Sequence, residues 1–216
     1  MVYIFPMTSS PLKPRRGRPP KSPRADQDTR AALIRSGTEL LTEQGFSASA
    51  IDTILKRVGV PKGSFYYYFA SKEAFGRAIM EHYGAYFANK LDRHLLNPRL
   101  PPLDRLAAFV ADAEAGMARH EFRRGCLVGN LGQEVASLPE TYRHWLRETL
   151  EDWQRRLARC LEEARAGGAL APSADCARLA EAFWIGWEGA VMRARLERSV
   201  RPMEVFIRCY LEGLPR

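Results

Sequence analysis

The sequence predicts an all-α protein, and three observations lead to this expectation. Apolar residues recur at spacings of three and four through most of the 216 residues, as one buried helix face requires. Glycine and proline separate these segments, for example at Gly45, Gly59 and Gly167. No stretch alternates between polar and apolar residues for long enough to form a strand. The composition, with 46% hydrophobic and 27% charged residues, is that of an ordinary globular protein.

The N-terminal residues 1–25 are rich in Pro, Arg, Ser and Lys, and we expect them to form a disordered basic arm. Residues 1–30 hold seven basic and two acidic residues, so more than half of the net charge of +8 lies there. Such a cluster favours a polyanionic partner, with a merely solvated tail as the alternative. An Arg-Gly-Arg-Pro run resembles the core of the AT-hook, in which Arg16 and Arg18 would follow a narrow, A·T-rich minor groove.

The next segment predicts three helices that together form a helix-turn-helix DNA-binding domain over residues 26–75. The first begins near Asp26 or Asp28, either of which can cap a helix, and ends at Gly45. A glycine turn links the second and third helices, and Pro61 suits the first position of the third. One face of the second helix carries apolar residues at helical spacing, namely Ile51, Ile54, Leu55 and Val58.

Residues 76–216 are expected to form a C-terminal helical domain for ligand binding and dimerisation. A fourth helix runs from Ser71 to about Arg93, and the proline-rich segment Asn97–Pro102 that follows is a candidate domain boundary. The remaining predicted helices are Leu103–Arg119, Cys126–Ala136, a long helix opened by a capping box at Ser137–Glu140, a helix capped by Ser173, and a last helix from Arg201.

The third helix carries the clearest functional pattern. Phe65 and Phe69 are expected to face inward, because they lie four residues apart. The other side would present Lys62, Gly63, Ser64, Tyr66 and Tyr67. Hydroxyl groups and a lysine can bind phosphates or base edges, and glycine permits close approach of the backbone. DNA is therefore the expected partner of this face, with packing of the tyrosines against neighbouring helices as the alternative.

Lys72 occupies an unfavourable position, because it lies in the first turn of the fourth helix, where the helix dipole favours anions. A DNA phosphate held by Lys72 and the free helix amides would explain it.

The stretch Gly59–Glu73, together with Phe46 and the Ile51–Ile54 face, resembles the signature of the TetR family of bacterial regulators. The resemblance implies an all-helical dimer, a recognition helix at residues 61–67, a C-terminal ligand-binding domain and a dimer interface made by the last two helices. The position that usually holds histidine is Tyr68 in this chain.

Two further stretches, Phe122–Glu134 and Glu181–Ala190, resemble the acrylate-responsive branch of that family. The Gly-Cys-Leu within the first is also similar to electrophile-sensing members that control N-ethylmaleimide reductase. The resemblance implies a repressor that acrylate or a related unsaturated carboxylate or electrophile releases from its operator. A cysteine-based electrophile or redox sensor is the alternative.

Cys126 is the candidate reactive thiol. It is predicted to open a helix close to Arg123 and Arg124, and both features lower a thiol pKa. Arg123 and Arg124 would also attract a carboxylate. The alternative for Cys126 is a small, inert residue of the core.

The second candidate ligand cluster is Trp184, Trp187 and Glu188. Tryptophan offers a flat apolar wall to an unsaturated ligand. Part of this helix is also expected at the dimer interface, because the small residues Gly186 and Gly189 permit close helix packing. The sequence leaves open which of the two tryptophans faces the pocket.

Other classes of function lack support. The chain has no glycine-loop, nucleophile-elbow or zinc-protease motif, its four histidines and four cysteines are scattered, and no apolar run would span a membrane. We therefore expect no catalytic residues, cofactor, metal or membrane contact, but a cytoplasmic homodimer that binds double-stranded operator DNA and a small inducer. An enzyme is one rival class. A purely structural DNA-binding protein is another, and the long segment after Pro102 argues against it.

Overall fold

A computed structural model describes residues 23–216, and over this range the chain forms nine α-helices and no strand, which confirms the predicted all-α class. Arg16 and Arg18, the predicted minor-groove residues, lie outside the described part of the chain. The first helix, α1 (Pro23–Gln44), begins before Asp26, so this aspartate lies in the first turn rather than at the predicted cap. No helix in residues 23–216 is long and apolar enough to cross a lipid bilayer.

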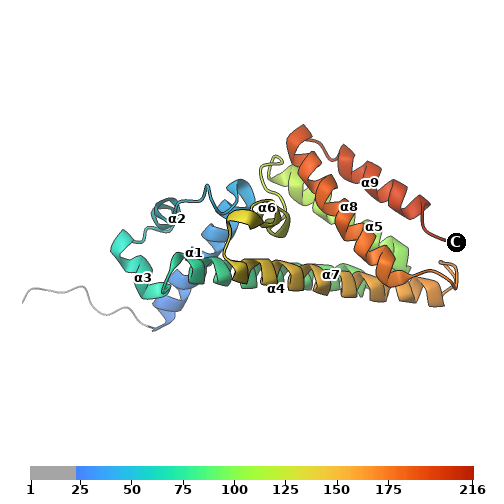
Figure 1. Cartoon of the computed structure of the whole chain (residues 1–216), viewed down its shortest axis with the longest axis horizontal. Helices are drawn as coiled ribbons and strands as arrows, with labels where there is room; N and C mark the ends of the chain where they lie inside the picture. The colour runs from blue at the N-terminus through green and yellow to red at the C-terminus, as the bar shows by residue number, and fades with distance from the viewer. Residues whose placement is uncertain (1–22) are drawn as a thin grey trace, which may run out of the picture.

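One end of the molecule holds α1 with the short helices α2 (Ile51–Val58) and α3 (Phe65–Tyr68) (Figure 1). A 3-10 turn precedes α3, so the third helical segment spans residues 62–68 rather than 61–67. Gly59 has a φ of 70°, and its N–H bonds back to α2, a left-handed cap that glycine adopts without strain. This reversal sets α3 across α2 in a helix-turn-helix arrangement.

The long helix α4 (Lys72–Leu95) connects the two parts of the molecule (Figure 1). Ser71, where the helix was predicted to begin, caps it, since its Oγ accepts a hydrogen bond from the backbone N–H of Ala74 at 3.0 Å. The first turns of α4 pack closely on α1, because Gly37 has no side chain: a Cβ there would lie only 2.4 Å from Ile79 Cδ1. The rest of α4 packs against the C-terminal helices.

The remaining helices form the other end of the molecule: α5 (Pro102–Arg119), α6 (Leu127–Gln133), α7 (Glu140–Ala166), α8 (Cys176–Glu197) and α9 (Arg201–Glu212). Aromatic rings fill the space where α4, α5, α7 and α8 meet. The ring of Trp153 lies 4.2 Å from that of Phe87 and 5.0 Å from that of Trp184. On the outer side, α9 covers α8, and the ring of Phe206 occupies the space that Gly186 leaves free.

Two helix starts differ from the predictions. The capping box at Ser137–Glu140 is wrong, because Ser137 belongs to a separate 3-10 turn and its hydroxyl donates to the carbonyl of Glu134. At the start of α8, Asp175 rather than Ser173 is the cap, and its carboxylate accepts from the N–H of Arg178.

Candidate DNA-binding surface and ligand cavity

The third helical segment presents the expected polar face. Phe65 and Phe69 are buried, whereas Tyr66 and Tyr67 are 73% and 71% exposed. Gly63 has open space around it, and it is exposed together with Lys62, while Ser64 is half-buried. The alternative in which Tyr66 packs against a neighbouring helix is therefore wrong. The packing alternative is correct for Tyr68, which is half-buried against the core.

Acidic side chains orient two members of this face. The Tyr67 hydroxyl donates to Asp26 Oδ2 at 2.8 Å, and this hydrogen bond to a negative group raises the pKa of Tyr67. The Lys62 ammonium lies 2.9 Å from Asp52 Oδ2 on an exposed surface. Exposed pairs of this kind are weak, so a phosphate can replace the carboxylate as partner.

Lys72 has a partner within the protein. Its exposed ammonium lies 4.6 Å from the centre of the Phe46 ring. A cation over an aromatic face is attracted by the ring quadrupole. This contact explains a lysine in the first turn of α4 without DNA, so a phosphate contact by Lys72 remains a prediction.

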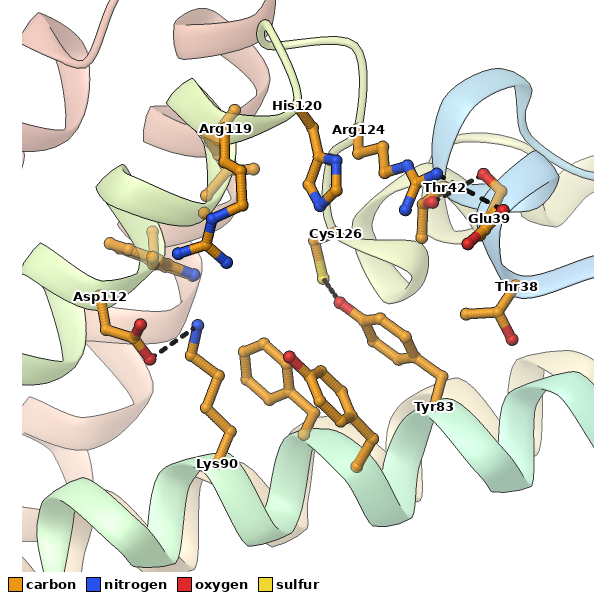
Figure 2. Close-up of a pocket in the computed structure, with 18 of the residues that line it drawn as sticks. Thr38, Glu39, Thr42, Tyr83, Lys90, Asp112, Arg119, His120, Arg124 and Cys126 are labelled. Carbon is orange, nitrogen blue, oxygen red and sulfur yellow. Dashed lines mark hydrogen bonds and ion pairs between the residues drawn. The ribbon is translucent and has the colours of Figure 1, made fainter. Parts of the chain in front are cut away.

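A cavity of about 600 Å³ lies between α1, α4, α5 and the segment that leads into α6 (Figure 2). Tyr83, Phe87 and Lys90 line it from α4, and Trp187 contributes from α8. This volume suits a small organic ligand. Cys126 also lines the cavity, so two of the residues predicted to bind the ligand, Cys126 and Trp187, lie at the same cavity.

The surroundings of Cys126 disfavour the reactivity that the sequence predicted, which stays a prediction. Its side chain is buried, and burial together with the negative charge of Glu188 raises the thiol pKa well above its ordinary value. These effects outweigh the lowering by the backbone N–H of Gly129 in α6. The Tyr83 hydroxyl also donates to Cys126 Sγ at 3.7 Å. Cys126 is therefore a thiol at neutral pH.

The two arginines near Cys126 form ion pairs with acidic side chains of the protein. Arg123 is exposed, pairs with Glu121 at 3.8 Å and does not line the cavity, so its predicted place near the ligand is wrong. Arg124 does line the cavity, but its guanidinium binds Glu43 at 3.1 Å and Glu39 at 3.5 Å, both on α1.

The three residues of the second candidate ligand cluster lie in different surroundings. Trp187 faces the cavity, whereas Trp184 lies in the aromatic core, where its Nε1 has no hydrogen-bond partner among the described residues. Glu188 lies beside Cys126 in space left by Gly129, where a Cβ would lie only 2.1 Å from Glu188 Oε2. Burial raises the pKa of Glu188 to about 7.

Sequence reasoning missed the charged end of the cavity. Lys90 comes from α4, Asp112 and Arg119 from α5, and His120 from the turn after α5 (Figure 2). These residues come from α4, α5 and the turn after α5, and they form no local motif. The one available signal was helical spacing, which places Lys90 on the same face of α4 as Tyr83. No cluster of three or more potential metal ligands occurs within residues 23–216.

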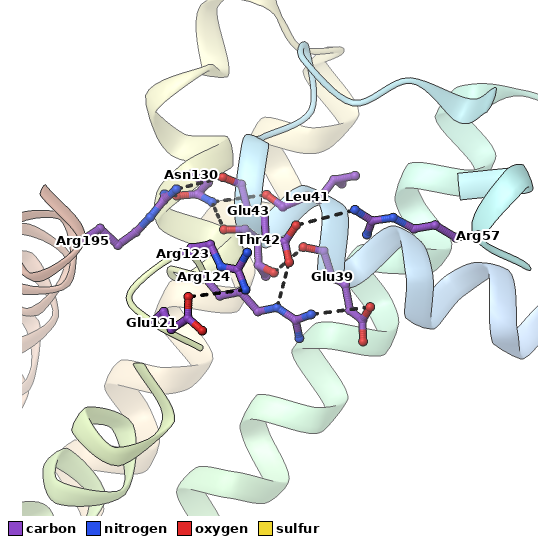
Figure 3. A network of polar contacts seen from close by, with 10 residues as sticks. All are labelled: Glu39, Leu41, Thr42, Glu43, Arg57, Glu121, Arg123, Arg124, Asn130 and Arg195. Atoms are coloured by element: carbon purple, nitrogen blue, oxygen red, sulfur yellow. Dashed lines mark hydrogen bonds and ion pairs between the residues drawn. The ribbon is translucent and has the colours of Figure 1, made fainter. Parts of the chain in front are cut away.

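A network of polar contacts, which we call the α1 clamp, joins the end of α1 to the C-terminal helices (Figure 3). Asn130 Nδ2 donates to the carbonyls of Leu41 and Thr42 at 3.2 and 2.9 Å. Arg195 donates to Asn130 Oδ1 and to the Glu43 carbonyl, both at 2.9 Å. Carbonyls in the last turn of a helix have no partner within it, so residues from α6 and α8 satisfy those of α1.

Two further contacts complete the α1 clamp. The Glu134 carboxylate accepts from the backbone N–H groups of Phe46 and Ser47 at 3.0 and 2.8 Å. Gly45, with a φ of 79°, makes this approach possible, because a Cβ there would collide with Glu134. The Gly125 N–H, next to Cys126, donates to the α1 carbonyl of Thr42 at 3.1 Å. The cavity wall is thus bonded directly to α1.

Comparison with known proteins agrees with this geometry. The family described as bacterial regulatory proteins, tetR family, matches residues 33–79, and the tetracyclin repressor-like C-terminal domain matches residues 102–210. The chain is 54% identical to the transcriptional regulator AcuR of Cereibacter sphaeroides over 94% of this chain and 92% of that protein. It is 32% identical to the HTH-type transcriptional repressor NemR of Escherichia coli, over 83% and 90% of the two chains.

A solved structure shares the fold. The crystal structure of regulatory protein TetR from Rhodobacter sphaeroides superposes with a TM-score of 0.84 at 52% identity, over 86% of this chain and 98% of that one.

Proposed function

Because this chain belongs to the TetR family of bacterial transcriptional regulators, we propose that it is a homodimeric repressor that a small unsaturated carboxylate releases from its operator DNA. The chain is a DNA-binding regulator and not an enzyme. The observation that carries the ligand-responsive part is the segment of Arg124 and Gly125, which lines the cavity on one side and bonds to α1 on the other.

Dimerisation through α8 and α9 is supported by an exposed apolar face. Ile185 and Leu196 of α8 are 71% and 78% exposed, and Val205 of α9 is 52% exposed. Large apolar residues gathered on one surface typically mark a protein interface. A twofold axis along this face would give the dimer two copies of α3, one for each half of a palindromic operator.

Acrylate or a related unsaturated carboxylate is the proposed inducer. The resemblance of the segments around Cys126 and Trp187 to the acrylate-responsive branch supports it, as does a cavity that combines an aromatic wall with positive charge. Reversible binding is favoured over covalent addition, because a buried thiol with a raised pKa is a poor nucleophile. Similarity to the repressor NemR supports an electrophile sensor as the alternative.

The signal would pass through the α1 clamp. A ligand that binds one arrangement of the segment at Arg124 and Gly125 more tightly than another shifts the equilibrium between them. Because this segment is bonded to the end of α1, the shift changes the angle of the helix-turn-helix. Two recognition helices with altered spacing no longer fit successive major grooves.

Tyr66→Ala is expected to lower operator affinity at least about tenfold, because each half-site of the dimer loses one contact of about 1 kcal/mol or more. The free energy of unfolding should not change, since Tyr66 is 73% exposed. Fluorescence anisotropy with a labelled operator measures the affinity. Tyr66→Phe separates the hydroxyl from the ring. Wild-type affinity in Tyr66→Ala would remove this residue from the DNA-binding surface.

Acrylate is expected to release the operator from both the wild type and Cys126→Ser at similar concentrations, because reversible binding needs no thiolate. Operator release is followed by the same anisotropy signal, and intact mass reports any adduct. A mass increase of one acrylate per chain, with loss of release in Cys126→Ser, would support the covalent alternative. If neither protein responds to acrylate or to N-ethylmaleimide, the proposed class of inducer is wrong.

A further inference from the structure

We propose that the cavity contains an anion site between Lys90 and Arg119, which binds the carboxylate of the inducer and selects charged ligands over neutral ones of the same shape. This inference rests on the proposed function, because it concerns the same cavity. It moves the carboxylate away from Arg123 and Arg124, the two residues that the sequence predicted to attract it.

The first argument is the balance of charge around the cavity. Its lining holds five arginines and lysines against two acids, namely Arg35, Lys90, Arg93, Arg119 and Arg124 against Glu39 and Asp112. Arg124 is held by the acids of α1. Of the other four, Lys90, Arg93 and Arg119 lie on α4 and α5, so most of the remaining positive charge is at that end of the cavity. Charges in a partly enclosed site act on a ligand more strongly than they do in water.

The second argument is the environment of Lys90. Its side chain is only 12% exposed, and its ammonium lies 3.1 Å from Asp112 Oδ2. The same carboxylate also binds His94 Nε2 at 3.0 Å and Arg93 at 3.4 Å. The single carboxylate of Asp112 thus pairs with three basic side chains, and it cannot neutralise all of their positive charge. A largely buried ammonium that shares its only acid retains capacity for a second anion.

Asp112 would repel a ligand carboxylate if its own charge were not compensated. Burial pushes the pKa of Asp112 upward, but hydrogen bonds from His94 and Lys90 outweigh this effect and hold the pKa below its ordinary value. Asp112 is therefore ionised at neutral pH and bound to His94 and Lys90. A positive group that has no acidic partner must therefore come from another residue of the cavity.

Arg119 supplies that group. It lies in the last turn of α5, and Figure 2 shows its guanidinium and the Lys90 ammonium extending toward each other across the cavity. Arg119 makes no side-chain hydrogen bond or ion pair with any residue of the described range, although it lines the cavity. A carboxylate placed between Lys90 Nζ and Arg119 would accept charge-assisted hydrogen bonds from both.

The remaining part of the ligand would then point toward the apolar end. Tyr83 and Phe87 precede Lys90 on the same face of α4, so they lie up to about 10 Å from it along the helix. Tyr83 contacts Cys126, and Trp187 lines the same region. The cavity therefore has a cationic end and an aromatic end, which match the two ends of an unsaturated carboxylate.

Acrylate and acrylamide test the selection, because they share a shape and differ in charge. Wild-type protein is expected to release its operator at an acrylate concentration at least about tenfold below that of acrylamide, given the strength of hydrogen bonds between charged groups. Arg119→Gln should raise the acrylate concentration about tenfold and leave the acrylamide concentration unchanged. Arg123→Gln is the matched control, because Arg123 is exposed and outside the cavity lining, and it should change neither concentration.

Calorimetric titration of acrylate into the DNA-free protein separates this inference from the proposed function. Binding that weakens about tenfold in Arg119→Gln but not in Arg123→Gln supports the anion site, even if the operator is not released. In that case the proposed release mechanism is wrong and the site stands. Equal acrylate affinity in the two variants, or no acrylate binding by the wild type, overturns the anion site. Release of the operator from the wild type at equal concentrations of acrylate and acrylamide also overturns it.

Discussion

Asn130→Ala is expected to lower the free energy of unfolding by about 2–3 kcal/mol. The substitution removes three hydrogen bonds around a partly buried amide, each worth about 1 kcal/mol. It also leaves Arg195 and the carbonyl of Leu41 without this partner. Urea denaturation followed by circular dichroism measures the change. Gln133→Ala on the same helix is the control, because Gln133 is exposed and its side chain makes no hydrogen bond within the described residues.

The same variant is expected to lose most of the inducer's effect on operator affinity. Coupling between two sites is typically about 1–3 kcal/mol, or about 5- to 150-fold in affinity. Asn130 belongs neither to the cavity lining nor to α3, so its removal affects the connection rather than either site. Operator affinity is measured with and without saturating inducer. An unchanged ratio of the two affinities in Asn130→Ala would exclude the α1 clamp as the route.

Glu188→Gln is expected to remove a pH-dependent loss of stability. The pKa of Glu188 is raised from its ordinary value of 4.5 to about 7, because burial disfavours the carboxylate. The folded protein therefore binds this proton more tightly than the unfolded chain. The associated stability is complete below about pH 4.5 and is lost as the pH rises through 7. The loss amounts to about 3 kcal/mol at higher pH.

Glutamine carries no titratable proton, so Glu188→Gln should gain stability relative to the wild type by about 3 kcal/mol between pH 4.5 and pH 8. The difference between two unfolding curves, taken at each pH and at one protein concentration, isolates this residue from other titrating groups. Glu181→Gln provides the control, since Glu181 is exposed on the same helix. A constant difference between wild type and Glu188→Gln over this range would show that folding does not raise the pKa of Glu188.

Much of the fold was predictable from local patterns. Three predictions that depend on residues close together in sequence were confirmed: the turn at Gly59, the inward pair Phe65 and Phe69, and the start of α4 at Ser71. The capping box at Ser137–Glu140 failed although its pattern was correct. The preceding chain forms a 3-10 turn. The Ser137 hydroxyl, which was predicted to cap α7, donates instead to the carbonyl of Glu134.

The ligand site was less predictable, because tertiary packing decides it. Cys126 and Arg123 are close in sequence, yet one side chain is buried and the other is exposed. The thiol pKa depends on Glu188, a residue on another helix that no local pattern connects to Cys126. Lys90 and Arg119 also come from different helices. Only the three-dimensional structure shows that they face the same cavity.

The Arg195 side chain has a consequence for synthesis of the protein. It bonds to the carbonyl of Glu43, 152 positions earlier in the chain, so the contact cannot form until α8 has left the ribosome. The helix-turn-helix of a growing chain thus has its recognition surface but no fixed angle and no second protomer. In the dimer proposed above, the second protomer binds through the last two helices. A nascent chain therefore cannot occupy both halves of an operator before translation has reached these helices.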